Sequence, residues 1–206
     1  MRFPIFSAAF AALCLALPTT AQEGKPAADA KGADVKGATA TSQRAEARIM
    51  VFNEDFTVFA LASITHGQPV WQDKYDGMLD MLKGKINRLG KDWFTTLITS
   101  AELEIGGVKV APGSYVVGLA CDKDGKFALA LLDSSKAMKD KVNPFFGEWK
   151  PDYLLPLTLN KNVGKETVSL MVMTFDAKAD DAGKGTFTLA WGKHTLTAPV
   201  MLHAPK

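Results

Sequence analysis

Hydrophobic and polar residues alternate along much of the chain after residue 113, and a period of two residues is typical of β-strands. This pattern predicts strands over residues 114–121, 126–132, 166–175, 185–191 and 193–201. The first two strands are joined by Asp122-Lys123-Asp124-Gly125, which fits a hairpin turn because Gly125 can adopt a positive φ angle. The last two form a second hairpin around Gly192.

The segment 166–175 differs from the others because both of its alternating faces are largely apolar. Such a strand is expected in the centre of a sheet that is covered on both sides. The predicted core takes one face of each strand and contains Val117, Leu119, Phe127, Leu129, Leu170, Val172, Phe187, Leu189 and Trp191.

Helical spacing of apolar residues is rare. It predicts one helix over about residues 76–89, weakened by Gly77 and Gly84, and a second over 134–141 that Asp133 can cap. The chain shows no internal repeat and no alternation of strands with helices. We therefore predict an all-β fold, an antiparallel two-sheet β-sandwich of eight or nine strands with one or two short helices.

The first 48 residues have a different character. Residues 1–21 predict a signal peptide, because Arg2 precedes an apolar run that ends at Pro18 and the small residues of a cleavage site. A lipoprotein anchor at Cys14 is the alternative. Residues 22–48 are rich in Ala, Gly, Lys and Asp and predict a disordered tether, with a short Ala-rich helix over 42–48 as a second possibility. The folded domain is then expected over residues 49–206, in a bacterial protein that is periplasmic or secreted.

Composition excludes several partners. Loss of Arg2 with the signal peptide leaves 23 of the 24 basic residues against 22 acidic ones, a net charge near +1. No basic patch stands out, which argues against nucleic acid as a partner, and no later apolar run is long enough for a transmembrane helix. Cys121 would be the one cysteine left, so no internal disulfide is expected, and its place in an alternating strand predicts a buried thiol.

Three short motifs carry a family resemblance. They are the segment Ile64-Thr65-His66-Gly67-Gln68-Pro69, the turn Arg88-Leu89-Gly90 with a Thr-rich strand after it, and the turns at residues 105–108 and 111–113 before Tyr115. Together they resemble the bacterial exported family known as domain of unknown function 2911. The resemblance implies an exported β-rich fold but no reaction. The chain departs from the family at His66, where Tyr is usual, and at Asn87, where Trp is usual, while Trp191 matches a family Trp near the C-terminus.

Arg88 is the first candidate ligand-binding residue. A guanidinium beside a glycine turn can hold a carboxylate or a sulfated ligand through two parallel hydrogen bonds. The alternative is structural, with Arg88 paired to an internal carboxylate or to loop carbonyls.

His66 is a second candidate ligand-binding residue, and the loop over residues 143–153 supplies four aromatic ones, namely Phe145, Phe146, Trp149 and Tyr153. Exposed aromatic rings on such a loop bind sugars or peptides. Alternatively, these rings close an open end of the sandwich.

The three histidines, His66, His194 and His203, lack metal-ligand spacing, and His194 and His203 occupy positions where solvated histidines are common. The pair Asp122 and Asp124 lacks the later acid of a calcium loop. No metal or cofactor is predicted, because phosphate-loop, dinucleotide and nucleophile motifs are missing from the sequence.

The sequence therefore favours a non-enzymatic binding or envelope-associated module, with a small ligand, a glycan or an envelope protein as its partner. The alternative is an extracytoplasmic hydrolase that uses His66 with a nearby carboxylate such as Asp73 or Asp92.

Overall fold

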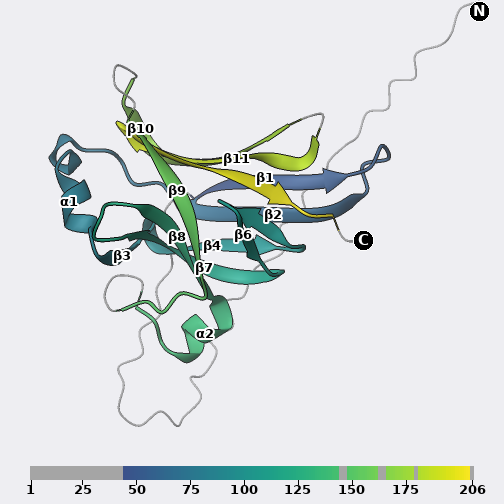
Figure 1. The fold of residues 1–206 in the computed structure, drawn as a ribbon, viewed down its shortest axis with the longest axis horizontal. Coiled ribbons are helices and arrows are strands. Elements are labelled where there is room, and N and C mark those ends of the chain that lie inside the picture. Colours follow the sequence, from purple (N-terminus) through teal and green to yellow (C-terminus); the bar gives the residue numbers. More distant parts are fainter. Residues whose placement is uncertain (1–43, 144–147, 162–165, 179–180, 205–206) are drawn as a thin grey trace, which may run out of the picture. The chain divides into compact units, whose positions relative to one another are not determined.

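The computed structural model describes residues 44–143, 148–161, 166–178 and 181–204 (Figure 1). In chain order their elements are β1 (Arg44–Phe52), β2 (Val58–Gly67), the 3-10 turn η1 (Asp73–Tyr75), α1 (Met78–Leu82), β3 (Lys85–Arg88), β4 (Lys91–Thr99), β5 (Leu103–Ile105), β6 (Val108–Val110), β7 (Gly113–Cys121), β8 (Phe127–Asp133), α2 (Ser134–Lys139), β9 (Tyr153–Lys161), β10 (Val168–Lys178), β11 (Asp181–Gly192) and β12 (His194–Leu202).

All twelve strands belong to one sheet, and every strand pair in it is antiparallel. The main path runs β1-β2-β4-β7-β8-β9-β12-β11-β10, while β3 pairs with β7, and β5 pairs with β12 and β6. The predicted all-β antiparallel class and both hairpins are confirmed. The two short helices, α1 and α2, lie at the margins of the sheet (Figure 1).

The predicted division into two separate sheets is wrong, because β9 belongs to both halves. Residues 153–157 of β9 pair with β8, and residues 158–161 pair with β12. A strand that changes its partner along its length turns the corner between the two halves. The hydrogen-bonded ladder therefore continues from one half to the other.

The two ends of the sheet path come back together. Strand β1 packs against β10, and the chain just after β2 bonds to β10 directly. Val70 forms a β-bridge with Leu170. The backbone N–H of Trp71 donates to the Ser169 carbonyl at 2.7 Å, and the backbone N–H of Met171 donates to the Pro69 carbonyl at 3.2 Å. The sheet is thus curled and nearly closed around a single main core.

Strand β10 is the last strand of the path, not the central strand that the sequence predicts. Its buried residues are Met171 and Met173, whereas Leu170 and Val172 are 41% and 37% exposed. The predicted core face is therefore wrong for this strand. Both faces of the segment are apolar, so alternation alone cannot decide which face is buried.

Most of the remaining core prediction is confirmed. Five of the predicted residues are buried, namely Val117, Phe127, Leu129, Phe187 and Leu189. Leu119 and Trp191 are partly buried and pack against the same core.

The helix predicted over 76–89 is correct only in its first half. Helix α1 ends at Leu82, Gly84 takes a φ of 71°, and β3 then pairs with β7. The helix predicted over 134–141 is confirmed by α2, where the Asp133 side chain accepts from the Lys136 N–H at 3.0 Å. In the described part of the chain, neither helix is both long and apolar enough to cross a membrane.

The predicted domain boundary at residue 49 falls inside β1. This strand begins at Arg44, and its pairing with β2 starts with Arg44 opposite Gly67. Residues 44–48 are therefore strand, not tether or helix, because Ala47 shares the buried face with Ile49 and Val51. The predicted signal peptide and the tether up to residue 43 lie outside the described residues.

The face assignment of β10 can be tested with two neighbouring substitutions. We expect Met173→Ala to lower the free energy of unfolding by about 2–4 kcal/mol, because it leaves a cavity in the core. Val172→Ala should cost less than about 1 kcal/mol, because the Val172 side chain is partly exposed. Urea unfolding of both variants measures the difference, and equal costs would contradict the observed face.

Candidate functional site

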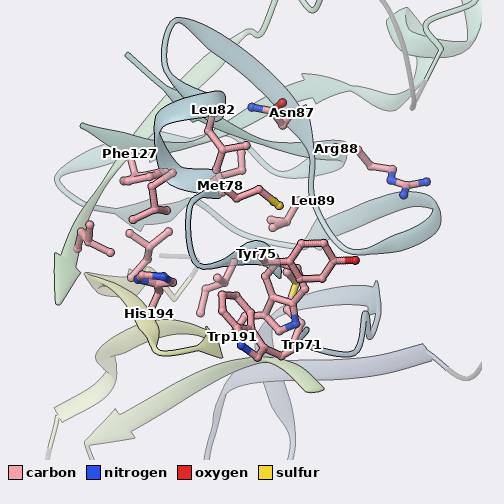
Figure 2. A pocket seen from close by; sticks show the side chains of 16 residues that line it. Trp71, Tyr75, Met78, Leu82, Asn87, Arg88, Leu89, Phe127, Trp191 and His194 are labelled. Atoms are coloured by element: carbon pink, nitrogen blue, oxygen red, sulfur yellow. The ribbon is translucent and has the colours of Figure 1, made fainter. Parts of the chain in front are cut away.

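An apolar cavity of about 110 Å³ lies beneath the η1–α1 segment. Its lining comes from η1, α1 and β3 and from one residue or more of each of the strands β7 to β12. Figure 2 shows these side chains converging on the space between the helical segment and the β11–β12 hairpin. The cavity therefore forms where both halves of the curled sheet meet the segment that follows β2.

Aromatic rings form one wall of the cavity. The ring of Trp71 meets the ring of Trp191 edge-on at 5.0 Å, and Tyr75 lies 5.1 Å from Trp191. The Trp191 Nε1–H donates to the Pro69 carbonyl at 2.9 Å. This hydrogen bond joins β11 to the chain segment that bridges to β10, so the aromatic wall and the sheet closure depend on each other.

Gly192 allows Trp71 to reach this position. Gly192 has a φ of 61°, and a Cβ atom built there would lie 2.3 Å from the Trp71 ring. Glycine meets both requirements, since it adopts positive φ readily and has no side chain to displace the indole.

The η1–α1 segment covers the cavity and is itself lightly packed. Met78, Leu79 and Leu82 line the cavity, yet no residue of η1 or α1 is fully buried. An ion pair of 3.0 Å links Asp76 to Lys193 on the β11–β12 turn. Both of these side chains are about half exposed, so the pair orients the segment but adds little stability.

Two buried donors at the cavity have no hydrogen-bond partner, namely Asn87 Nδ2 and Trp71 Nε1. An unsatisfied buried donor costs about 1–3 kcal/mol, so such groups call for a physical explanation. His194 also lines the cavity, and its ring lies 5.8 Å from Trp71. Its ring nitrogens are buried, so the solvated position expected from the sequence is wrong.

Arg88 lies at the end of β3, and its side chain points away from the cavity (Figure 2). Its Nη1 donates to the Asp92 carbonyl at 2.6 Å. This contact corresponds to the structural alternative, in which Arg88 bonds to a loop carbonyl.

The aromatic candidates are separated in the structure. Trp149 is 8% exposed, and its ring packs edge-on against Phe94 on the outer face of the sheet. Tyr153 packs against the main core beside Tyr115, at 5.8 Å between ring centroids. Phe145 and Phe146 lie outside the described residues. Trp149 and Tyr153 therefore do not form one exposed surface with Arg88.

Exposed aromatic side chains occur instead on the β1–β2 hairpin. Phe52, Phe56 and Phe59 are 50%, 78% and 50% exposed, and the rings of Phe52 and Phe56 stack at 5.8 Å. This hairpin and α1 lie at opposite ends of the sheet (Figure 1). Exposed apolar side chains of this kind are common at surfaces that contact other proteins or membranes. Those of the β1–β2 hairpin lie away from the cavity.

His66 is fully buried on the inner face of β2 and does not line the cavity. Its Nδ1 donates to the Gly67 carbonyl at 3.2 Å, while Nε2 has no partner. Burial lowers the pKa of His66 below its usual 6.5, and the nearby charge of Arg44 lowers it further. Among the described residues, no carboxylate hydrogen-bonds to it, as the hydrolase alternative would require.

The remaining candidate groups have structural surroundings. Cys121 is buried as predicted, and burial raises the pKa of its thiol. The Asp122 carboxylate accepts from the N–H groups of Asp124 and Lys126, as in a hairpin turn. Within the described ranges, no three His, Cys, Asp or Glu side chains are placed to hold a metal ion.

The sequence does not single out the residues that form this cavity. Trp71, Tyr75 and Asn87 are distant in the chain from His194, and only folding brings them together. One usable signal is the pair Trp191-Gly192, because a glycine next to an aromatic residue in a hairpin can mark a close approach of another segment.

Comparison with known proteins adds no family and no relative. The chain has no significant match among protein-family models, curated proteins or solved structures. The function must therefore be argued from the site itself.

The contact between Gly192 and Trp71 can be tested by adding one methyl group. We expect Gly192→Ala to lower the free energy of unfolding by about 2–4 kcal/mol, because it adds a clash with Trp71 to the strain of a positive φ. Gly107→Ala is the matched control, since Gly107 has a φ of 81° but nothing within 4 Å of its added Cβ. It should cost only about 1 kcal/mol. If chemical denaturation gives the same decrease in the free energy of unfolding for Gly192→Ala and Gly107→Ala, the contact with Trp71 is unimportant.

The buried state of His66 predicts a pH dependence of stability. Below pH 6.5 the unfolded chain binds a proton at His66 that the native state resists, so the free energy of unfolding should fall as the pH drops. Above pH 6.5 this contribution is fully present and constant. Unfolding measured between about pH 7.5 and pH 5.5 should give a smaller slope for His66→Asn than for the wild type. An unchanged slope would contradict the lowered pKa.

Proposed function

We propose that this protein is a non-enzymatic binding module that holds a small apolar molecule in the cavity beneath the η1–α1 segment. The observation that carries the proposal is the mainly aromatic and aliphatic lining of a partly open cavity of about 110 Å³. Apolar cavities of roughly 150 Å³ in other proteins bind benzene, so this space suits a ligand with one ring or a short branched chain. Trp71, Tyr75 and Trp191 provide the flat surfaces that such a ligand would contact.

The chemistry of the lining favours binding over catalysis. General acid–base catalysis needs a titratable group within hydrogen-bond reach of the reacting atoms. Titratable side chains do line the cavity, at Tyr75, Arg88 and His194, but none of the described lining residues is Asp, Glu, Lys or Cys, so the wall supplies no carboxylate to act as acid or base. The hydrolase proposal based on His66 is less well supported, since His66 lies in the core away from the cavity and without a carboxylate partner among the described residues.

The cavity is also a better candidate site than the surface around Arg88. The Arg88 guanidinium already donates to a loop carbonyl, and the ring of Trp149 packs against Phe94. A glycan or an envelope protein bound at that surface would have to displace these contacts. A small apolar ligand in the cavity displaces none of them.

We further propose that the protein is exported by the signal peptide and related to the family known as domain of unknown function 2911. Contacts among the motif residues support this relation. The Thr95 hydroxyl donates to the Leu89 carbonyl at 2.7 Å, and a Cβ atom at Gly90 would lie 3.0 Å from the Gly67 carbonyl oxygen. The motifs around His66, Arg88 and the Thr-rich strand thus meet at one place in the fold.

Binding can be tested with benzene as the probe, because Trp71 and Trp191 report on the cavity through their fluorescence. We expect benzene to change the tryptophan emission of the wild type in a saturable manner. Leu159→Phe should weaken this binding at least about tenfold, because a larger side chain fills the cavity that Leu159 lines.

Leu154→Phe is the matched control for this experiment. Leu154 lies on the same strand, but its side chain is 50% exposed on the outer face. The control should bind benzene like the wild type. No saturable response in the wild type, or equal binding by Leu159→Phe and Leu154→Phe, would contradict the proposed function.

A further inference from the structure

We infer that the ligand of this cavity is an uncharged molecule with a compact apolar body and one hydrogen-bonding group, and that this group pairs with the side chain of Asn87. The inference rests on the proposed function and specifies the chemical class of its ligand. Neutral phenols, alcohols, ketones and amides of about the size of one ring belong to this class.

The charge of the ligand is limited by the lining. Arg88 contributes to the cavity wall, but its guanidinium donates to the Asp92 carbonyl and points away from the enclosed space (Figure 2). The other ionisable lining residues in the described part of the chain are Tyr75 and His194, and none is a carboxylate or a lysine. A charged ligand would therefore give up its hydration without gaining a counter-charge, and burial of an unpaired ion is strongly unfavourable.

Strand pairing places Asn87 on the inner face of the sheet. Asn87 lies opposite Leu119 in the β3–β7 ladder, and both residues line the cavity. Directly paired residues in an antiparallel ladder direct their side chains to the same face, so the amide of Asn87 points inward with Leu119. Ile86 packs in the separate cluster on the outer face, as expected for the alternate position.

The Nδ2 donor of Asn87 is unused among the described residues. This atom is buried, and most of the residues that line the cavity with Asn87 are apolar. An isolated amide in such a place gains a hydrogen bond when a ligand brings one. The amide offers an N–H donor and a carbonyl acceptor, so it can accommodate either a hydroxyl or a carbonyl group.

Trp71 Nε1 is the second buried donor without a partner, but it is less suited to this role. Figure 2 shows Asn87 and Trp71 at opposite ends of the lining, so the single hydrogen-bonding group of a small ligand would meet only one of these two donors. The indole of Trp71 is held edge-on between Trp191 and His194, and Gly192 lies against its face. Asn87 has no ring contact of this kind and can adjust to a ligand.

A series of four ring compounds tests the inference at neutral pH. Benzene has no polar group, phenol has a neutral hydroxyl, benzoate is an anion and benzylamine is a cation. We expect phenol to bind the wild type about 3- to 10-fold more tightly than benzene, which is the usual net effect of one hydrogen bond. Benzoate and benzylamine should bind at least tenfold more weakly than benzene.

The variant Asn87→Leu identifies the residue responsible. It keeps a side chain of similar size and removes the amide, so phenol and benzene should bind it with the same affinity within about twofold. The ratio of the two affinities is measured within one variant, which separates the hydrogen bond from a general change in the cavity. If Asn87→Leu does not fold, Asn87→Thr and Asn87→Val provide a second comparison, because their side chains have the same shape. Of these two, only Asn87→Thr should retain a preference for phenol over benzene.

The outcomes distinguish the two levels of the proposal. Absence of binding by benzene and phenol to the wild type would overturn the proposed function, and the inference with it. Benzene binding that Leu159→Phe blocks, together with equal affinity for phenol, would leave the function intact and overturn the role of Asn87. A preference for phenol that persists in Asn87→Leu, or tight binding of benzoate, would also overturn the inference.

Discussion

Hydrogen bonds between residues 69–71 and the start of β10 hold the curled sheet together on its open side. Between Val168 and Val172 the register of β10 with β11 is interrupted, and the backbone of Ser169 and Met171 bonds to Trp71 and Pro69 instead. Buried backbone groups require partners, so this interruption is stable because the segment after β2 supplies them. Without this exchange β10 would be an open edge over the core.

The candidate site is a consequence of this closure. Once Pro69 and Trp71 are held beside β10, the Trp191 indole can donate to Pro69, and Trp71 can lie against Gly192. The η1–α1 segment then begins directly above the end of the sheet and covers it. The rings of Trp71 and Trp191, which meet edge-on, then form one wall of the cavity.

The main core and the segment that covers the cavity differ in how tightly they are packed. The main core contains rows of buried residues from β1, β2, β7, β8 and β12, whereas no residue of α1 is buried. The cover over the apolar cavity is thus lightly packed, as is typical of segments that open locally. The salt bridge between Asp76 and Lys193 links this cover to the β11–β12 turn and is accessible to solvent.

The sequence by itself determined the strand-rich class, the two hairpins at Gly125 and Gly192, the short helix capped by Asp133 and most of the core, because each depends on neighbours within about ten residues. Only the tertiary structure decided which face of β10 is buried, since Leu170 and Met171 are equally apolar and the choice depends on what packs against the strand. It also decided that residues 85–88 form β3 and not a helix, because the partner is β7. The cavity depends wholly on such long-range pairing. Trp71, Asn87 and Trp191 come together through the closure of the sheet, and no local pattern encodes a contact between segments so far apart in the chain.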